Sequence, residues 1–128
     1  MDEQREMEVF AALFLDDRQQ ALYFNIGPNF VENEMEGKFR KGTIVIVMGC
    51  NGLTNTSLAE AFFKKGVDTY FGFDGEVSAQ YTDKATGILM QHLVVEQMAP
   101  QQAASATAQE IGPDPVYGGK LLVLQKAQ

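Results

Sequence analysis

The run Thr43-Ile-Val-Ile-Val-Met48 decides the fold of this chain, because it is continuously apolar and rich in β-branched residues. Such a run, without alternation of polar and apolar residues, is typical of a strand that is buried on both faces in a parallel sheet. It ends at Gly49-Cys50-Asn51-Gly52, a loop whose glycines favour unusual backbone angles. We therefore expect a central parallel strand followed by a tight turn that carries the chain's single cysteine.

A helix and a second strand follow this loop. Ser57 and Glu60 have the spacing of a capping box, and Gly66 ends the helical pattern after two lysines. The apolar run from Val67 to Phe73 then predicts a strand. A strand, a helix and a strand at this spacing predict a right-handed crossover between parallel neighbours.

The chain before this unit predicts a hairpin. Apolar runs at 8–15 and 21–26 flank Asp16-Asp17-Arg18-Gln19, whose two aspartates are typical of a turn rather than of a metal site. A short helix is expected at about 30–39, where apolar residues recur at nearly helical spacing.

The chain after this unit predicts two helices and a strand. The first helix covers about 79–97 with Ser78 as its N-cap, and the second runs from Pro100 to a stop at Gly112-Pro113. A turn-rich loop, in which Asp114 lies between two prolines, leads to a strand at 120–125. We therefore expect one α/β domain over 1–128, a three-layer sandwich with a mostly parallel sheet, plus the N-terminal β-hairpin at 8–26.

Composition excludes several classes of function. The 17 acidic residues outnumber 10 scattered basic ones, and the net charge of −7 argues against nucleic acid and against an anionic membrane as partner. One cysteine and one histidine allow neither an internal disulfide nor an ordinary zinc site, and we expect no cofactor. The charged start, MDEQREME, is unlike a signal peptide, so a cytoplasmic protein with a free thiol is expected.

The chemistry is expected where the two central strands end. Parallel neighbours end at the same edge of a sheet, so Cys50 and Asp74 should lie on one rim. A helix that opens after Cys50 would direct N–H groups toward this rim, which favours a thiolate and would hold a developing oxyanion near Gly49, Asn51 and Gly52. The alternative is a structural one, because a lone cysteine is often a small apolar residue of the core.

From about Phe39 onward, roughly two-thirds of the chain, the sequence resembles the C-terminal half of a caspase-like cysteine peptidase domain. This group includes caspases, clostripain-like and gingipain-like peptidases and CHAT proteins, and the likeness is greatest to prokaryotic members of uncharacterised function. The residues that carry it are Ile44-Val-Ile-Val-Met-Gly-Cys50, Leu58-Ala-Glu-Ala-Phe-Phe-Lys-Lys-Gly66, Tyr70-Phe-Gly-Phe-Asp-Gly75 with Val77-Ser78, and Gly112-Pro-Asp-Pro-Val-Tyr-Gly118.

The resemblance implies roles for particular residues. Cys50 takes the position of the nucleophile. The next strand and its loop, here Phe73, Asp74 and Ser78, would line the pocket for the residue before the cleaved bond. An acidic residue there would suit a basic side chain of a peptide or protein substrate.

The chain departs from this family in one respect, because no histidine precedes Cys50. The family's general base is a histidine at the end of an earlier strand. His92 lies thirteen residues after Ala79, about 20 Å along the expected helix, and its apolar neighbours at helical spacing indicate a core-edge position. A thiol without its base is a poor nucleophile near neutral pH.

Three interpretations of this departure stay open. The chain is a fragment whose first half supplies the histidine, a half-domain that meets its partner in trans, or a degenerate member kept for binding. The hairpin would replace missing strands or cover the sheet edge, and an uncovered edge would favour a homodimer. The leading function is a cysteine-peptidase-like domain that is weakly active alone. The alternatives are a non-catalytic interaction module that uses its open sheet edge, and a domain that binds a small anion at the Cys50 loop.

Overall fold

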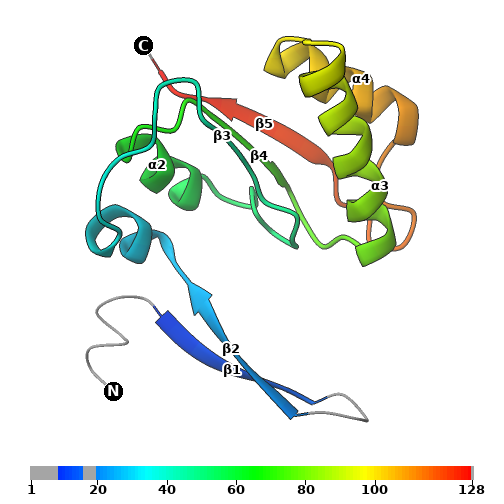
Figure 1. The fold of residues 1–128 in the computed structure, drawn as a ribbon. Coiled ribbons are helices and arrows are strands. Elements are labelled where there is room, and N and C mark those ends of the chain that lie inside the picture. The colour runs from blue at the N-terminus through cyan, green and yellow to red at the C-terminus, as the bar shows by residue number, and fades with distance from the viewer. Residues whose placement is uncertain (1–8, 16–19, 128) are drawn as a thin grey trace.

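The computed structural model describes residues 9–15 and 20–127, with side chains from residue 26 onward. In chain order its elements are β1 (Val9–Leu15), β2 (Gln20–Ile26), a π-helical turn η1 (Phe30–Glu34), β3 (Ile44–Ile46), α2 (Ser57–Lys64), β4 (Thr69–Phe73), α3 (Ala79–Met90), a π-helical segment η2 (Gln91–Val95), α4 (Pro100–Ile111) and β5 (Leu121–Gln125). The fold is mixed α/β (Figure 1).

The predicted N-terminal hairpin is confirmed. Strands β1 and β2 pair antiparallel, with Val9 opposite Ile26 and Leu15 opposite Gln20. They form a two-stranded sheet of their own. Asp16 and Asp17, in the expected turn, lie outside the described residues.

The second sheet has the order β3-β4-β5 and corrects two expectations. Strands β3 and β4 are parallel, as the crossover predicted, but β4 and β5 are antiparallel, so the sheet is mixed rather than mostly parallel. Strand β3 is an edge strand whose Ile44 is 40% exposed, whereas all five residues of β4 are buried. A β-branched run favours a strand, but the position of that strand in the sheet depends on which segments pair with it.

The two faces of this sheet are covered by different helices (Figure 1). Phe71 and Phe73 of β4 pack against α3 and α4, in a core that includes Tyr81 and Leu89. Tyr70, which points to the opposite face, packs near α2. Alternate residues of a strand face opposite sides, so β4 contributes to both cores.

Helix boundaries follow local signals with three corrections. The hydroxyl of Ser78 accepts a hydrogen bond from the Tyr81 amide at 3.3 Å, and α4 runs from Pro100 to a stop at Gly112, both as predicted. Helix α3, however, ends at Met90. The π-helical segment η2 follows it directly, and Gln97 then adopts a positive φ of 53°. The N-cap of α2 is Thr56 rather than Ser57.

The third correction concerns the helix expected at about 30–39. Within this range, only Phe30–Glu34 is helical, and the chain becomes extended at Met35. Within the described part of the chain, no helix is long and apolar enough to cross a membrane.

Candidate functional site

The loop that follows β3 and the segment that follows β4 lie against each other at one end of the sheet. Backbone hydrogen bonds join Leu53 N–H to the Phe73 carbonyl at 2.8 Å and Asn51 N–H to the Gly75 carbonyl at 2.9 Å. These bonds attach the loop after β3 to the last residue of β4 and to the segment that follows β4. The structure thus brings the Cys50 loop and the segment 74–78 together, and we call this end of the sheet the rim.

Cys50 is exposed on the rim and contacts the backbone of Val77. Its Sγ accepts from the Val77 N–H at 3.4 Å, and the thiol donates to the Val77 carbonyl oxygen, also at 3.4 Å. The exposed position argues against the interpretation of this cysteine as an apolar residue of the core. The N–H and the carbonyl of Val77 therefore both contact the sulfur and orient it.

A buried tyrosine supports the Cys50 loop from beneath. The Tyr70 hydroxyl donates to the Gly52 carbonyl oxygen at 2.9 Å, and burial raises the pKa of Tyr70 to about 12, so it remains a donor. A Cβ at Gly52 would lie 3.2 Å from Cγ1 of Val47 and 3.5 Å from the Gly72 Cα. Glycine at this position therefore allows the loop to approach β4 closely.

The three residues predicted to bind substrate have different surroundings. Asp74 is exposed on the rim, and its carboxylate accepts from the Lys120 N–H at 2.8 Å. Ser78 is half-buried and caps α3. Phe73 does not reach the rim surface: it is 1% exposed and its ring lies 5.8 Å from that of Tyr81. Its place on β4 directs the side chain into the core beneath α3, so the expected substrate contact is corrected.

The expected oxyanion and anion-binding groups are largely occupied. The amides of Asn51 and Leu53 donate to carbonyls of the segment after β4 and of β4, and the Ser57 amide at the start of α2 donates to Asn55 Oδ1 at 3.1 Å. These donors cannot bind an anion at the same time. Gly49 is the one loop glycine of the predicted set with open space around its Cβ position, because no atom lies within 4 Å there.

Asp114 is the rim residue whose importance the sequence did not reveal. It is 2% exposed, and its carboxylate accepts from the Ser78 N–H at 2.8 Å, the Ser78 hydroxyl at 3.0 Å, the Tyr117 N–H at 3.2 Å and the Val116 N–H at 3.3 Å. Burial alone would raise the pKa of Asp114, but the bonds from Ser78, Val116 and Tyr117 outweigh it and lower that pKa. The position between two prolines predicted a turn, and the loop 112–119 does border the rim.

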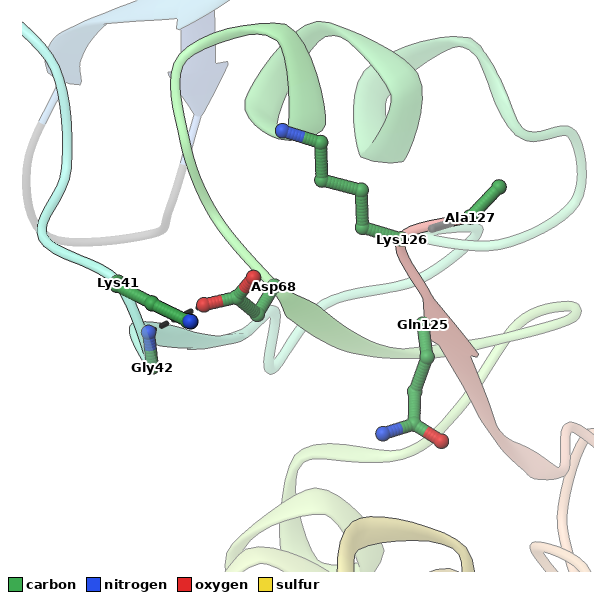
Figure 2. A pocket seen from close by; sticks show the side chains of 6 residues that line it. All are labelled: Lys41, Gly42, Asp68, Gln125, Lys126 and Ala127. Carbon is green, nitrogen blue, oxygen red and sulfur yellow. Dashed lines mark hydrogen bonds between the residues drawn. The ribbon is translucent and has the colours of Figure 1, made fainter.

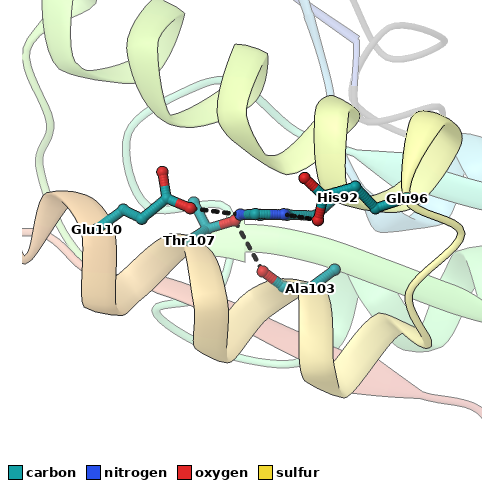
Figure 3. Close-up of polar contacts among 5 residues, drawn as sticks. All are labelled: His92, Glu96, Ala103, Thr107 and Glu110. Atoms are coloured by element: carbon teal, nitrogen blue, oxygen red, sulfur yellow. Dashed lines mark hydrogen bonds and ion pairs between the residues drawn. The ribbon is translucent and has the colours of Figure 1, made fainter.

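His92 is confirmed as a core-edge residue. It is 7% exposed, with Nδ1 2.8 Å from Glu96 Oε2 and Nε2 2.7 Å from Glu110 Oε1 (Figure 3). Hydrogen bonding to Glu96 raises the pKa of His92, burial opposes this, and Glu110 adds to the rise. Both ring nitrogens lie within hydrogen-bond distance of carboxylate oxygens, so His92 is not free to act as a base toward a substrate.

His92 also lies far from the cysteine along α3. Cys50 contacts Val77, immediately before that helix begins, whereas His92 lies in η2 beyond the helix's other end (Figure 1).

A hollow of about 860 Å³ lies at the opposite end of the strands from the rim (Figure 2). Its lining includes Lys41, Asp68 and Lys126, but the Asp68 carboxylate is paired with the Gly42 N–H. Among residues 9–15 and 20–127, no three His, Cys, Asp or Glu side chains are placed to hold a metal ion.

No protein-family model, no curated protein and no solved structure matches this chain. Function is therefore inferred from the geometry of the rim and from the sequence.

Proposed function

We propose that this chain is the C-terminal half of a caspase-like cysteine peptidase domain, with Cys50 as its nucleophile. The observation that carries the proposal is the exposed sulfur, held by the backbone of Val77 on the rim where parallel strands β3 and β4 end. The order of a parallel crossover followed by an antiparallel strand, with α2 on one face and α3 and α4 on the other, supports a caspase-like three-layer fold.

The reaction follows from the chemistry of a thiol. A base takes the Cys50 proton, the thiolate attacks the carbonyl carbon of a peptide bond, and the C–N bond breaks as the base returns that proton to the leaving amine. Water then hydrolyses the thioester, which releases the carboxylic acid and restores the thiol. His92 cannot be this base because its two nitrogens are bonded to Glu96 and Glu110.

We place the missing base on polypeptide that pairs with the exposed edge of β3. Ile44 on this edge is 40% exposed and Met48 just beyond it is 46% exposed. Among the described strands, only β4 pairs with β3, so the other edge of β3 presents apolar side chains beside backbone that no described strand pairs with. A strand added there would end next to Cys50. The preceding half of a longer chain or a partner in trans would supply it.

The substrate class follows from charge. Asp74 and Glu76 are both exposed on the segment that contacts the Cys50 loop. Two carboxylates on the segment that contacts the Cys50 loop favour a basic side chain immediately before the cleaved bond.

The test is covalent labelling of Cys50 by an electrophilic peptide. Even without the base, binding on the acidic rim would hold the electrophile beside the sulfur. A peptide with lysine beside the reactive carbon should therefore label Cys50 faster than it labels free cysteine, and faster than the same peptide with glutamate there. Cys50→Ala should remove the label entirely, as read by intact-protein mass spectrometry. A rate equal to that of free cysteine, with no preference between the two peptides, would overturn the proposal.

A second candidate, a non-catalytic interaction module, is favoured by the same exposed edge. If this is the function, the chain should form a dimer or larger species in light scattering, and Ile44→Lys should dissociate it. Cys50→Ala should leave that assembly unchanged. A monomer at all accessible concentrations would exclude self-association through β3.

A further inference from the structure

We infer that Asp114 is a positioning residue for Cys50 and acts through the peptide group that joins Val77 to Ser78. The inference rests on the proposed function in so far as the oriented sulfur is taken to be a nucleophile. Its structural basis is a chain of contacts that runs from a buried carboxylate through one peptide group to the sulfur.

The first step is the environment of the carboxylate. Asp114 is nearly sealed from solvent, and four hydrogen-bond donors surround its two oxygens, two of them from Ser78. A buried carboxylate that is ionised needs such donors, and losing them is costly. Asp114 therefore fixes the loop 112–119 and the start of α3 relative to each other.

The second step is the rigidity of the peptide group. The Ser78 N–H that donates to Asp114 and the Val77 carbonyl that accepts from the Cys50 thiol belong to the same planar unit. In a trans peptide these two bonds point in opposite directions. Asp114 and Cys50 thus form hydrogen bonds on opposite sides of one rigid peptide group. Any rotation of this peptide group moves the Val77 carbonyl oxygen that accepts from the Cys50 thiol.

The third step is the second contact between Val77 and the sulfur of Cys50. The Val77 N–H also reaches Cys50 Sγ at 3.4 Å, so one residue holds the sulfur through both of its backbone groups. The Val77 N–H belongs to the preceding peptide group, whose Glu76 carbonyl accepts from the Gly119 N–H at 3.2 Å. Losing the Asp114 anchor would release the carbonyl contact first and, through the Val77 Cα that joins the two groups, loosen the N–H contact. The sulfur would then sample several rotamers, and attack on a bound carbonyl, which depends on orientation, would slow.

The test compares two electrophiles on wild type and Asp114→Asn. Iodoacetamide needs only an exposed thiol, whereas a peptide electrophile bound on the rim needs an oriented one. In Asp114→Asn we expect the ratio of the peptide rate to the iodoacetamide rate to fall about tenfold. Asp83→Asn, which removes an exposed carboxylate on α3, is the matched control and should leave the ratio unchanged.

Amide exchange measured by NMR supplies a readout that does not depend on peptidase chemistry. The Val77 and Ser78 amides should lose protection in Asp114→Asn, while the amides of β4 keep theirs. If the ratio stays within twofold of wild type and both amides remain protected, the inference is overturned. A purely structural role would lower the melting temperature and leave the ratio in the folded protein unchanged, which also overturns it.

Two further outcomes can be distinguished from a failure of the inference: a variant that does not fold, and a failure of the proposed function. Should Asp114→Asn fail to fold, Ser78→Ala removes one contact to the carboxylate and keeps the amide contact, and it should lower the ratio about threefold. Should wild-type Cys50 react no faster than free cysteine with the peptide, the proposed function fails. The exchange of Val77 and Ser78 then still decides whether Asp114 holds their peptide group.

Discussion

The single cysteine and the single histidine of this chain lie near opposite ends of the segment formed by α3 and η2, in contrasting environments. The sulfur of Cys50 is exposed and bonds only to backbone among its described contacts, whereas the ring of His92 is buried between Glu96 and Glu110. An exposed group held by rigid backbone can meet a substrate. A buried group whose polar atoms are all paired contributes to stability instead.

The largest expected difference between the two regions is in covalent labelling. Cys50→Ala should abolish reaction with the lysine-containing electrophilic peptide. His92→Gln should change its rate by less than twofold, because His92 contacts Glu96, and Glu110 of α4, rather than the rim. Intact-mass time courses measure both. A tenfold loss in His92→Gln would show that the histidine acts on the cysteine after all.

The next largest effect is expected at Gly119, beneath the rim. A Cβ there would lie 2.4 Å from the Glu76 carbonyl oxygen and 2.6 Å from Cγ1 of Val77, so the backbone that holds Cys50 must shift. Gly119→Ala should lower the free energy of unfolding by about 2 kcal/mol and slow peptide labelling severalfold. Urea titration and mass spectrometry provide the two measurements.

Gly87→Ala is the matched control, because Gly87 lies within α3 and a Cβ there meets no atom within 4 Å. It should stabilise the protein by about 0.5–1 kcal/mol through helix propensity and leave labelling unchanged. Equal stability of the two alanine variants would contradict the tight packing described for the rim.

A smaller, pH-dependent effect is expected at His92. Its pKa is raised above the ordinary 6.5, chiefly by hydrogen bonding to Glu96. The stability that this rise contributes is fully present below about pH 6.5 and is lost as the pH increases through the raised value in the folded state. His92→Gln should therefore cost more stability at about pH 6 than at about pH 9, as measured by urea titration. The same cost at both pH values would contradict the raised pKa of His92.

The smallest effect is expected at Tyr70, beneath the Cys50 loop. Tyr70→Phe removes the donor to the Gly52 carbonyl and should cost about 1 kcal/mol, with a slight change in labelling. With a pKa of about 12, Tyr70 should contribute little phenolate absorbance below about pH 11. Because the chain has four tyrosines, this contribution is measured as the difference between the ultraviolet titrations of wild type and Tyr70→Phe. A difference signal that rises near pH 10 would show that the hydroxyl is not buried.

Much of the fold could be predicted because short-range signals define the elements. Ser78, Pro100 and Gly112 bound helices as their backbone preferences require, and the predicted β1–β2 hairpin is present. The prediction from sequence failed where the pairing of segments distant in the chain decides the arrangement of the strands. The run at Thr43–Met48 gives an edge strand of three residues, and the antiparallel direction of β5 has no local signature.

The sequence by itself determined which groups are available. These are a single thiol after a strand, a single imidazole later in the chain, and an aspartate between two prolines. Tertiary structure alone decided their environments, namely an exposed sulfur on the rim, an imidazole between two carboxylates, and a buried carboxylate that holds Ser78. The reason is physical. Turn and helix preferences act over a few residues, but burial and hydrogen-bond partners come from segments that are distant in the chain and meet only when the sheet and its helices assemble.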